Sequence, residues 1–384
     1  MISSDFASSP SLPSQSPGVP TPFLPQPSLD PALASSVPPL SISCSRQFTQ
    51  WLGEQSISLA FTTYQSNRLF LVGLNGQGQL ATFERLLDRP MGLAASPDGN
   101  RLYLSTRYQI WRLENVLDPG QHYKEGDRLY VPRQGFITGD LDTHDLTIDH
   151  QGNVIFMNTA NNCLATLSDR HSFRPLWFPP FISKLAAEDR CHLNGLALVE
   201  GQPRYASAVS QSDIIDGWRE QRQTGGCILD IATNQVIATG LSMPHSPRWY
   251  RDRLWVLNSG LGEFGFIDLD QGTFEALTFC PGYVRGLAFW GDYGLVGLSK
   301  PRDQTFAGLA LDDRLTAKNT TARCGIYVID LRSGDIVHWL QMEGVVTELY
   351  DVQVLPGVKR PTALGFRSNE IAQLITSDPA LNFI

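Results

Sequence analysis

The sequence predicts an all-β protein: a six-bladed β-propeller of four-stranded antiparallel blades, with its ring closed by N- and C-terminal strands. Three observations support this. Short apolar or alternating runs bounded by Gly, Asp, Asn or Pro fill the chain after residue 46, and helical patterns are few. One short motif recurs six times. Its copies define units of about 40–50 residues, a period that a two-sheet sandwich would not show.

The short runs read as consecutive β-strands. Typical examples are residues 102–105, 154–158, 254–258 and 325–330, which are rich in Leu, Ile, Val and aromatic residues. Gly, Asp and Asn stand between the runs and supply the turns.

The recurring motif places a polar residue before a small or acidic one, followed by apolar positions. The aligned residues are Gly92, Asp145, Gly195, Pro247, Gly286 and Asp351, with spacings of 53, 50, 52, 39 and 65. We place the motif at the entry to the innermost strand of each blade. The last copy lacks most of its following strands, so we expect N-terminal strands to complete that blade. Residues 56–63 and 362–366 are both candidates for one slot, which leaves the closing register open.

Two other kinds of segment differ from this pattern. Residues 1–45 are dominated by Ser and Pro and predict a disordered tail, which leaves residues 46–384 for the propeller. Four insertions are longer than turns need: residues 114–139, 167–190, 211–224 and 303–323. We expect partial helix in residues 181–190 and 303–323.

Composition limits the partners and the compartment. Net charge is −8 and no Lys/Arg block is present, so we expect no nucleic-acid partner. The sequence contains no run of about 18 apolar residues, so we expect no membrane span. The six cysteines are scattered without a CxxC pair, and no secretory signal is evident, so we expect free thiols and a cytoplasmic location. The oligomeric state stays open.

Strand direction gathers the polar motif residues at one mouth of the central channel. In an antiparallel blade, the loop entering strand one and the loop between strands two and three lie at the same end. Several bases meet there in an otherwise acidic chain, which favours a small anionic ligand because Arg binds carboxylates and phosphates in a bidentate manner. Trp218, in one insertion, is a candidate lid residue. The ligand-binding candidates are Arg89, Arg107, Asn158, Asn194, Asp213, Arg248, Asn258, Arg285, Lys300, Arg302, Glu348 and Asp351.

The catalytic candidates are His144, Asp145, His192 and His245. The three histidines begin consecutive blades, and three imidazoles with an open position suit a transition metal such as Zn, Fe or Cu. Strand alternation, however, turns His245 away from the other two. Metal binding, acid–base or substrate-binding roles, and hydrogen bonding between blades therefore all stay open. Asp145 and Asp351 fit either caps for backbone N–H groups or general bases whose pKa is raised by burial.

Several phrases resemble a family of bacterial proteins of unknown function, some of which are fused to tetratricopeptide repeats. The phrases are residues 212–226, 243–249, 254–260, 280–289 and 297–302. The resemblance covers about residues 46–370 and implies a six-bladed propeller without an established activity. A looser similarity is to gluconolactonase and lactonase propellers, which hold calcium with Glu, Asn and Asp. This chain has His and Arg where calcium requires oxygen ligands.

Two function classes fit these observations, because fold alone does not choose between them. The first is a binding or scaffold module with a His/Arg-lined pocket for a small anionic ligand or a protein or peptide partner. The alternative is an enzyme (hydrolase-, lyase- or isomerase-like, or metal-assisted) that acts on a small anionic or peptidic substrate in the same pocket.

Overall fold

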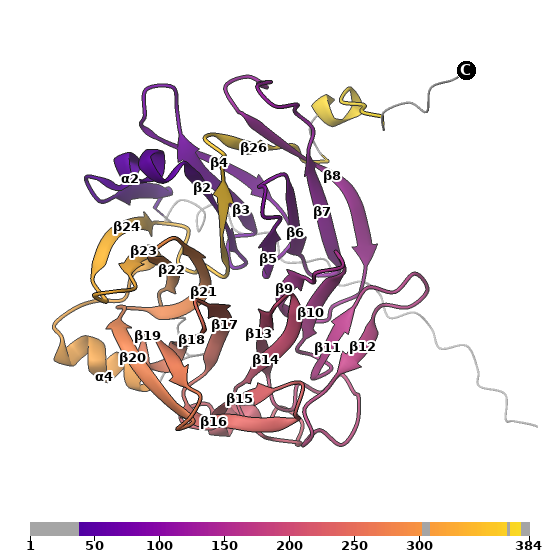
Figure 1. The fold of residues 1–384 in the computed structure, drawn as a ribbon, viewed down its shortest axis with the longest axis vertical. Helices are drawn as coiled ribbons and strands as arrows, with labels where there is room; N and C mark the ends of the chain where they lie inside the picture. The colour runs from indigo at the N-terminus through magenta and orange to yellow at the C-terminus, as the bar shows by residue number, and fades with distance from the viewer. Residues whose placement is uncertain (1–37, 302–307, 367–368, 378–384) are drawn as a thin grey trace, which may run out of the picture. The chain divides into compact units, whose positions relative to one another are not determined.

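The computed structural model describes residues 38–301, 308–366 and 369–377. Six sheets are arranged around a central axis, as Figure 1 shows, and the prediction of a six-bladed β-propeller is confirmed. Four blades in the middle of the chain are built from consecutive strands, and in each blade the strands run in chain order from the axis outward.

The first comprises β5 (Leu93–Ala95), β6 (Arg101–Ser105), β7 (Gln109–Asn115) and β8 (Arg128–Ile137). The second comprises β9 (Thr143–Ile148), β10 (Val154–Asn158), β11 (Cys163–Thr166) and β12 (Arg174–Trp177). The third comprises β13 (Leu193–Val199), β14 (Gln202–Ala208), β15 (Gly226–Asp230) and β16 (Gln235–Leu241). The fourth comprises β17 (Pro244–Tyr250), β18 (Arg253–Asn258), β19 (Glu263–Asp268) and β20 (Thr273–Phe279).

The remaining two blades use the chain ends. The fifth comprises β21 (Tyr283–Trp290), β22 (Tyr293–Ser299), β23 (Cys324–Asp330), β24 (Ile336–Glu343) and, at its outer edge, β1 (Ser41–Cys44). The sixth has the C-terminal β25 (Val352–Pro356) at the axis, followed by β2 (Ile57–Thr63), β3 (Arg68–Leu74) and β4 (Leu80–Leu86). The predicted ring closure by N- and C-terminal strands is thus confirmed.

The structure also settles the closing register. β2 pairs with β25 so that Ile57 lies opposite Pro356, and residues 56–63 therefore fill the contested slot. The C-terminal segment instead forms β26 (Pro361–Ala363), which runs parallel to β8 as a fifth strand. Two blades therefore have five strands, where four were expected.

The tail boundary differs from the expectation as well. Residues 1–37 lie outside the described part of the chain. Residues 38–45, which the Ser/Pro composition assigns to the disordered tail, include β1, whose backbone pairs with β24 from Ser41 opposite Glu343 to Cys44 opposite Leu340. The paired backbone of β24 places this segment within the folded unit, which begins before residue 46.

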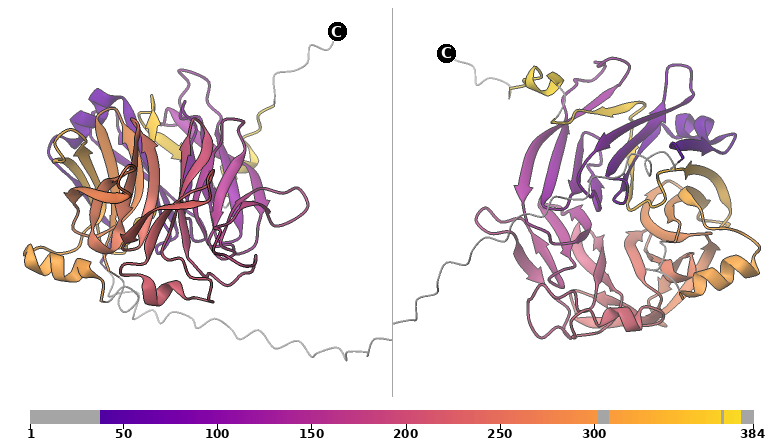
Figure 2. Two further views of the ribbon diagram at one scale, coloured as in Figure 1. Left: turned by 60° about the horizontal axis from the view of Figure 1, so that its bottom comes forward. Right: turned by 180° about the vertical axis from the view of Figure 1, so that it is seen from behind.

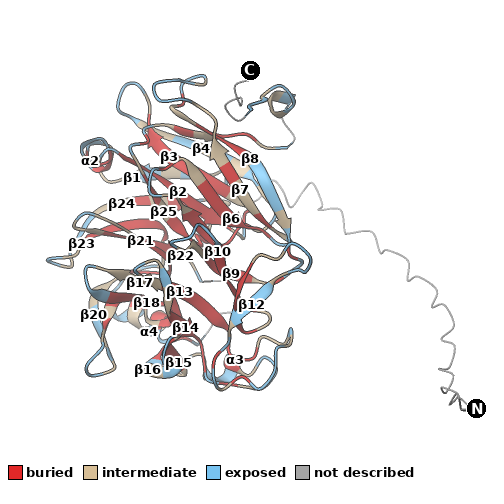
Figure 3. Cartoon of the chain, turned by 45° about the vertical axis from the view of Figure 1, so that its right-hand side comes forward, coloured by how far each residue is buried: buried red, intermediate tan, exposed pale blue. Residues whose placement is uncertain are grey.

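The hydrophobic core lies between the blades. Each of the six gaps between adjacent blades holds its own apolar cluster. Along β3, Phe70 and Val72 pack into one gap, whereas Leu69 and Leu71 pack into the next. Both faces of such a strand are buried, which is why it reads as a continuous apolar run. Outer strands such as β12 are more exposed, as Figure 3 shows.

The aligned motif has a packing origin. Around the ring, glycine alternates with a larger residue, and a Cβ atom on each glycine would stand within 3.1 Å of the aligned residue of the next blade. The pairs are Gly92 with Asp145, Gly195 with Pro247, and Gly286 with Asp351. Inner strands approach closely at these points, so one member of each pair has no side chain.

The helices are short. They are α2 (Phe48–Gln55), α3 (Trp218–Gln221), α4 (Ala310–Ala317) and the 3₁₀ turns η1 (Ser259–Leu261) and η2 (Asn369–Ala372). α4 lies in the insertion where helix was predicted. Residues 181–190 instead form turns and bends, and their chain is held by side-chain bonds such as that from Arg190 to Asp213 at 2.5 Å. α3 and α4 lie on the same side of the blades in Figure 2.

The two helical insertions pack together. Trp218 from the first and Leu309, Leu311 and Leu315 from the second belong to one buried cluster with Met243. All six cysteines, which fall in the described part of the chain, are free thiols. Among residues that the structure describes, no helix has the length and apolar character needed to cross a membrane.

Candidate functional site

The loops that enter the innermost strands share an unusual backbone. Arg89, Asp142 and His192 each stand three residues before the aligned motif residue, and all three adopt left-handed φ values of 50°. Met243, at the entry to β17, has φ 48°. This conformation costs a non-glycine residue about 1–2 kcal/mol and concentrates at functional sites. The four residues line one cavity at the mouth of the channel.

That cavity has a volume of about 280 Å³. Four of its residues immediately precede the aligned motif residue of their blade: Met91, His144, Arg285 and Tyr350. The residue directly before the aligned motif residue therefore lines the mouth cavity in four of the six blades. The full lining is Tyr64, Arg89, Met91, Asp142, His144, Asp189, His192, Trp218, Arg219, Arg222, Met243, Arg285 and Tyr350.

One wall is built around Asp189. Its Oδ2 accepts hydrogen bonds from His192 Nδ1 at 2.8 Å and from the Trp218 indole N–H, also at 2.8 Å. The His192 ring stacks on Trp218 with centroids 4.1 Å apart. Arg219 covers the Trp218 ring at 4.4 Å. The carboxylate thus fixes both the imidazole and the indole that the insertion brings to the mouth.

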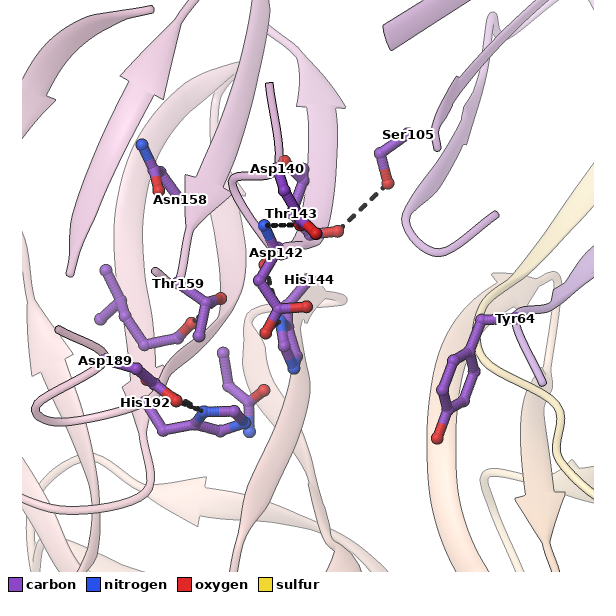
Figure 4. A network of polar contacts seen from close by, with 12 residues as sticks. Tyr64, Ser105, Asp140, Asp142, Thr143, His144, Asn158, Thr159, Asp189 and His192 are labelled. Atoms are coloured by element: carbon purple, nitrogen blue, oxygen red, sulfur yellow. Dashed lines mark hydrogen bonds and ion pairs between the residues drawn. The ribbon is translucent and has the colours of Figure 1, made fainter. Parts of the chain in front are cut away.

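His144 faces His192 edge-on, with ring centroids 4.7 Å apart (Figure 4). Its Nδ1 lies 2.8 Å from the backbone oxygen of Asp142. Burial lowers the pKa of His144 to about 4, against the opposing pull of Asp142, so the ring is neutral at pH 7. Burial raises the pKa of Asp142, but His144, His192 and Arg89 outweigh it and leave that pKa below its usual value.

The opposite wall is aromatic and cationic. The Arg285 guanidinium lies 5.7 Å from the Tyr350 ring centroid and 3.4 Å from the Tyr64 hydroxyl, which in turn donates to Glu348 at 2.5 Å. The Tyr350 hydroxyl is buried and has no hydrogen-bond partner among the described residues. Burial raises the pKa of Tyr350 well above its usual value, which keeps the hydroxyl a donor.

His245 lies behind this cavity and is absent from its lining. It is buried and stacks on His144 at 6.5 Å, and its Nε2 is 3.3 Å from the Asn194 amide nitrogen. A register shift in β17 between His245 and Arg248 breaks the strand alternation, so the expectation that His245 turns away from His144 was wrong. Burial lowers the pKa of His245 well below its usual value.

The proposed transition-metal site does not fit this geometry. His144 and His192 line the cavity, but His245, whose ring centroid is 6.5 Å from that of His144, does not, so the three imidazoles do not face one open space. His192 donates Nδ1–H to Asp189, as metal-binding histidines also do, so only its Nε2 could be a ligand atom. Within the described ranges, no group of three or more His, Cys, Asp or Glu side chains is placed to hold a metal ion.

Asp145, Arg248 and Asp351 form a charged plug inside the channel. Arg248 donates to both carboxylate oxygens of Asp145, at 2.7 and 3.1 Å, and lies 3.9 Å from Asp351. Asp145 also accepts the Leu196 N–H at 3.0 Å, and Asp351 accepts the Leu93 N–H at 2.9 Å. Both aspartates cap backbone of the next blade, and neither lines the mouth cavity.

The plug includes one strongly perturbed carboxyl group. Burial and the neighbouring Asp145 raise the pKa of Asp351 to about 7, although Arg248 opposes the shift. The raised pKa reflects a structural position, because Asp351 is 3% exposed and its oxygens already accept backbone N–H groups. The plug therefore explains Asp145, Arg248 and Asp351 as stabilising residues.

Other predicted residues support loops and do not line the cavity. Arg107 is exposed and lies 3.5 Å from Asp88. Asp213 pairs with Arg190 and accepts the Ser183 N–H at 3.1 Å, so it anchors its insertion.

The buried amides accept backbone N–H groups, and Lys300 does not line the cavity. Asn158 accepts the Asn161 N–H at 3.1 Å, and Asn258 accepts the Ser242 N–H at 2.8 Å. Lys300 holds its loop through a backbone N–H bond to Thr347 at 2.8 Å. Glu348 stands behind the wall as the acceptor for Tyr64, and Arg302 lies outside the described residues.

Sequence reasoning missed several cavity residues. Tyr350 occupies the same motif position as His144, directly before the aligned aspartate, and that register could have identified it. Asp142 and Asp189 stand two and three residues before a candidate histidine. Tyr64 follows β2 in the closing blade, so only ring closure brings it to the mouth.

These features define a class of protein: a six-bladed β-propeller with an Arg- and His-lined cavity at one mouth of its channel. Within that class, the chain belongs to the family described as a domain of unknown function (DUF4915), whose model matches residues 46–364. None of the curated proteins matches the chain.

Two solved structures match the chain over most of its length. A chain from a crystal structure of a nidogen/laminin complex is 13% identical, with 78% of this chain and 99% of that chain covered and a TM-score of 0.50. A protein of unknown function from Bacteroides caccae is 11% identical, with 78% and 98% covered and a TM-score of 0.46. At such identities the first likeness supports the fold alone.

Proposed function

We propose that this propeller is a binding module for a small organic anion, which it holds in the cavity at the mouth of the channel. The observation that carries the proposal is the Tyr350 hydroxyl: it is buried, it belongs to a residue that lines the cavity, and it has no hydrogen-bond partner among the described residues. Leaving such a group unpaired costs about 1–3 kcal/mol. An anionic oxygen in the cavity would accept this hydrogen bond and remove the cost.

The charges around the cavity favour an anion. Four guanidinium groups and two carboxylates line it, in a chain whose net charge is −8. Both carboxylates are already occupied, because Asp189 accepts from His192 and Trp218, and Asp142 pairs with Arg89. The remaining field at the mouth is positive, and Arg geometry suits carboxylate or phosphate.

The size of the cavity favours a small ligand. About 280 Å³ lies just below the range of roughly 300–1,000 Å³ that drug-sized ligands occupy. A protein or peptide partner would have to insert a single acidic side chain or its terminal carboxylate.

Calorimetric titration with hexanoate and with inorganic phosphate tests the proposal. We expect saturable binding of at least one probe at one site per chain, weakened by added salt because the attraction is between charges. Y350F keeps the ring that packs against Tyr64 and His144, and it should weaken that binding at least about tenfold. Absence of saturable binding for hexanoate, inorganic phosphate and the hydroxylated carboxylate D-gluconate alike, or equal affinity in Y350F, would contradict the proposal.

A second candidate is acid–base catalysis in the same cavity, and it rests on the Asp189–His192 contact. A carboxylate that binds Nδ1 orients an imidazole and leaves Nε2 as the base, which is the arrangement of many general bases. Proton NMR of D-gluconate incubated with the protein in D₂O tests it. Exchange of the C2 proton for deuterium, abolished in D189N, would support a base at His192, whereas no exchange would leave only the binding function.

A further inference from the structure

We propose that the anion is a hydroxycarboxylate, in which hydroxyl groups on the carbons next to the carboxylate donate to His144 and His192. This inference rests on the proposed function and names the ligand class of the same site. It follows from the tautomers of the two histidines and from where they stand in the cavity.

The hydrogen bond to the backbone fixes the tautomer of His144. Its Nδ1 lies 2.8 Å from the Asp142 carbonyl oxygen, which can only accept, so Nδ1 carries the proton. The ring is neutral at pH 7 because burial lowers its pKa to about 4. Nε2 therefore holds a lone pair, and it belongs to a residue that lines the cavity.

His192 has the same polarity for a different reason. Its Nδ1 lies 2.8 and 3.1 Å from the two carboxylate oxygens of Asp189, so Nδ1 is the donor in this contact as well. In the neutral ring, Nε2 is then the acceptor. Stacking on Trp218 at 4.1 Å and the edge-on contact with His144 fix the plane of the ring.

A donor residue and an acceptor residue of the cavity both lie beside the Tyr350 ring. Arg285 lies 5.7 Å from the Tyr350 centroid, and His144 lies 5.8 Å from the same centroid. A carboxylate at Arg285 and the Tyr350 hydroxyl therefore leaves the next carbons of the ligand beside His144 and His192. Figure 4 shows the two histidines together, with Tyr64 across from them.

This polarity discriminates between anions. An alkyl carboxylate would satisfy Tyr350 but would bury the two imidazole acceptors against apolar carbon, and a buried acceptor without a donor is costly. Asp142 and Asp189 do not compete for the hydroxyl groups, because Arg89, His192 and Trp218 already bind them. A polyhydroxylated carboxylate satisfies both sides of the cavity.

Calorimetric titration with D-gluconate and hexanoate tests the inference, since both are six-carbon monocarboxylates that differ in their hydroxyl groups. We expect the wild type to bind gluconate at least tenfold more tightly than hexanoate. H192F should reduce this preference severalfold, because phenylalanine retains the stack on Trp218 and lacks the acceptor. H338F is the matched control, since His338 also packs beside a tryptophan, at 5.5 Å from Trp51, and does not line the cavity.

The outcomes separate the two proposals. Equal affinity for gluconate and hexanoate would overturn the hydroxycarboxylate assignment and leave the anion site standing. Binding of neither probe, together with no binding of inorganic phosphate, would overturn the anion site itself. If H192F does not fold, ¹⁵N NMR of the wild type decides: a gluconate-induced shift of the His144 and His192 Nε2 resonances supports the inference, and unchanged resonances under saturating gluconate overturn it.

Discussion

Arg248 on β17 donates to both carboxylate oxygens of Asp145 on β9, at 2.7 and 3.1 Å, across the width of one intervening blade. The innermost strand of that blade, β13, binds the same carboxylate, because its Leu196 N–H donates a hydrogen bond to Asp145. One buried ion pair thus ties three blades from inside the channel, and Arg248 extends the link towards Asp351 at 3.9 Å.

Removing this cation should destabilise the whole ring. R248M leaves Asp145 buried without its charged partner, a change that typically costs about 3–5 kcal/mol of unfolding free energy. Urea unfolding measures it. R251M is the control on the same hairpin, because Arg251 pairs with Asp292 on the surface and such pairs contribute less than about 1 kcal/mol. Equal losses in both variants would show that the channel pair has no special role.

The close approach of the inner strands makes a second prediction. A Cβ on Gly195 would stand 2.4 Å from Cδ of Pro247 and 3.0 Å from the Ser246 nitrogen. G195A should therefore cost about 1–3 kcal/mol through overpacking. A Cβ on Gly76 would meet nothing within 4 Å, so G76A should be neutral within about 1 kcal/mol. Thermal unfolding compares the two, and an unchanged melting temperature in G195A would refute the packing account.

The buried hydroxyl groups of two tyrosines predict opposite effects on stability. Tyr350 has no partner among the described residues, so Y350F should keep or raise the free energy of unfolding by up to about 1 kcal/mol. The Tyr130 hydroxyl donates to the Gly99 carbonyl at 2.5 Å, so Y130F should lower it by about 1 kcal/mol or more. Denaturant unfolding of both variants measures the contrast. A loss in Y350F as large as that in Y130F would mean that the Tyr350 hydroxyl is satisfied within the fold.

Acid should weaken the protein through His144. Its pKa is about 4 in the folded chain and about 6.5 when unfolded, so the unfolded state binds more protons between these values. The stability present above pH 6.5 is therefore lost as the pH falls towards 4, by about 2 kcal/mol between pH 7 and pH 5. The contribution of Asp351 to stability changes in the opposite direction. Because its pKa is raised in the folded chain, this contribution falls as the pH rises towards 7.

Comparison of variants isolates the histidine, since the contribution of Asp351 is common to all of them. H144Q should flatten the pH dependence by about 2 kcal/mol relative to the wild type. H122Q, at an exposed position, should leave it unchanged. Unfolding curves at pH 5 and pH 7 give the comparison, and parallel behaviour of H144Q and the wild type would contradict the buried, neutral imidazole.

The period and the strand pattern were sufficient to predict the propeller, because each blade repeats one short motif at its axis. The register of closure was beyond the sequence, since residues 56–63 and 362–366 both fit the same slot in the closing ring. Only the pairing of Ile57 with Pro356 distinguishes them. The fifth strands were likewise unpredictable, because β1 and β26 are three to four residues long.

The site was predictable in its position and less so in its members. Strand direction placed Arg89, His144, His192 and Arg285 at one mouth, where the structure has them. Strand direction does not say how far along the channel axis a residue lies. Asp145, Arg248 and Asp351, which form the plug, were therefore grouped with the cavity residues. The bulge in β17 also reverses the facing of His245, and nothing in the alternation pattern signals it.

The location of a bound anion shows whether the mouth cavity is the anion site. Crystals of the wild-type protein grown with saturating D-gluconate, hexanoate or inorganic phosphate would show it in difference density. We expect an anionic oxygen within hydrogen-bond distance of the Tyr350 hydroxyl and beside Arg285. Density for the probes only at other surfaces, with the mouth cavity holding none of them, would contradict it.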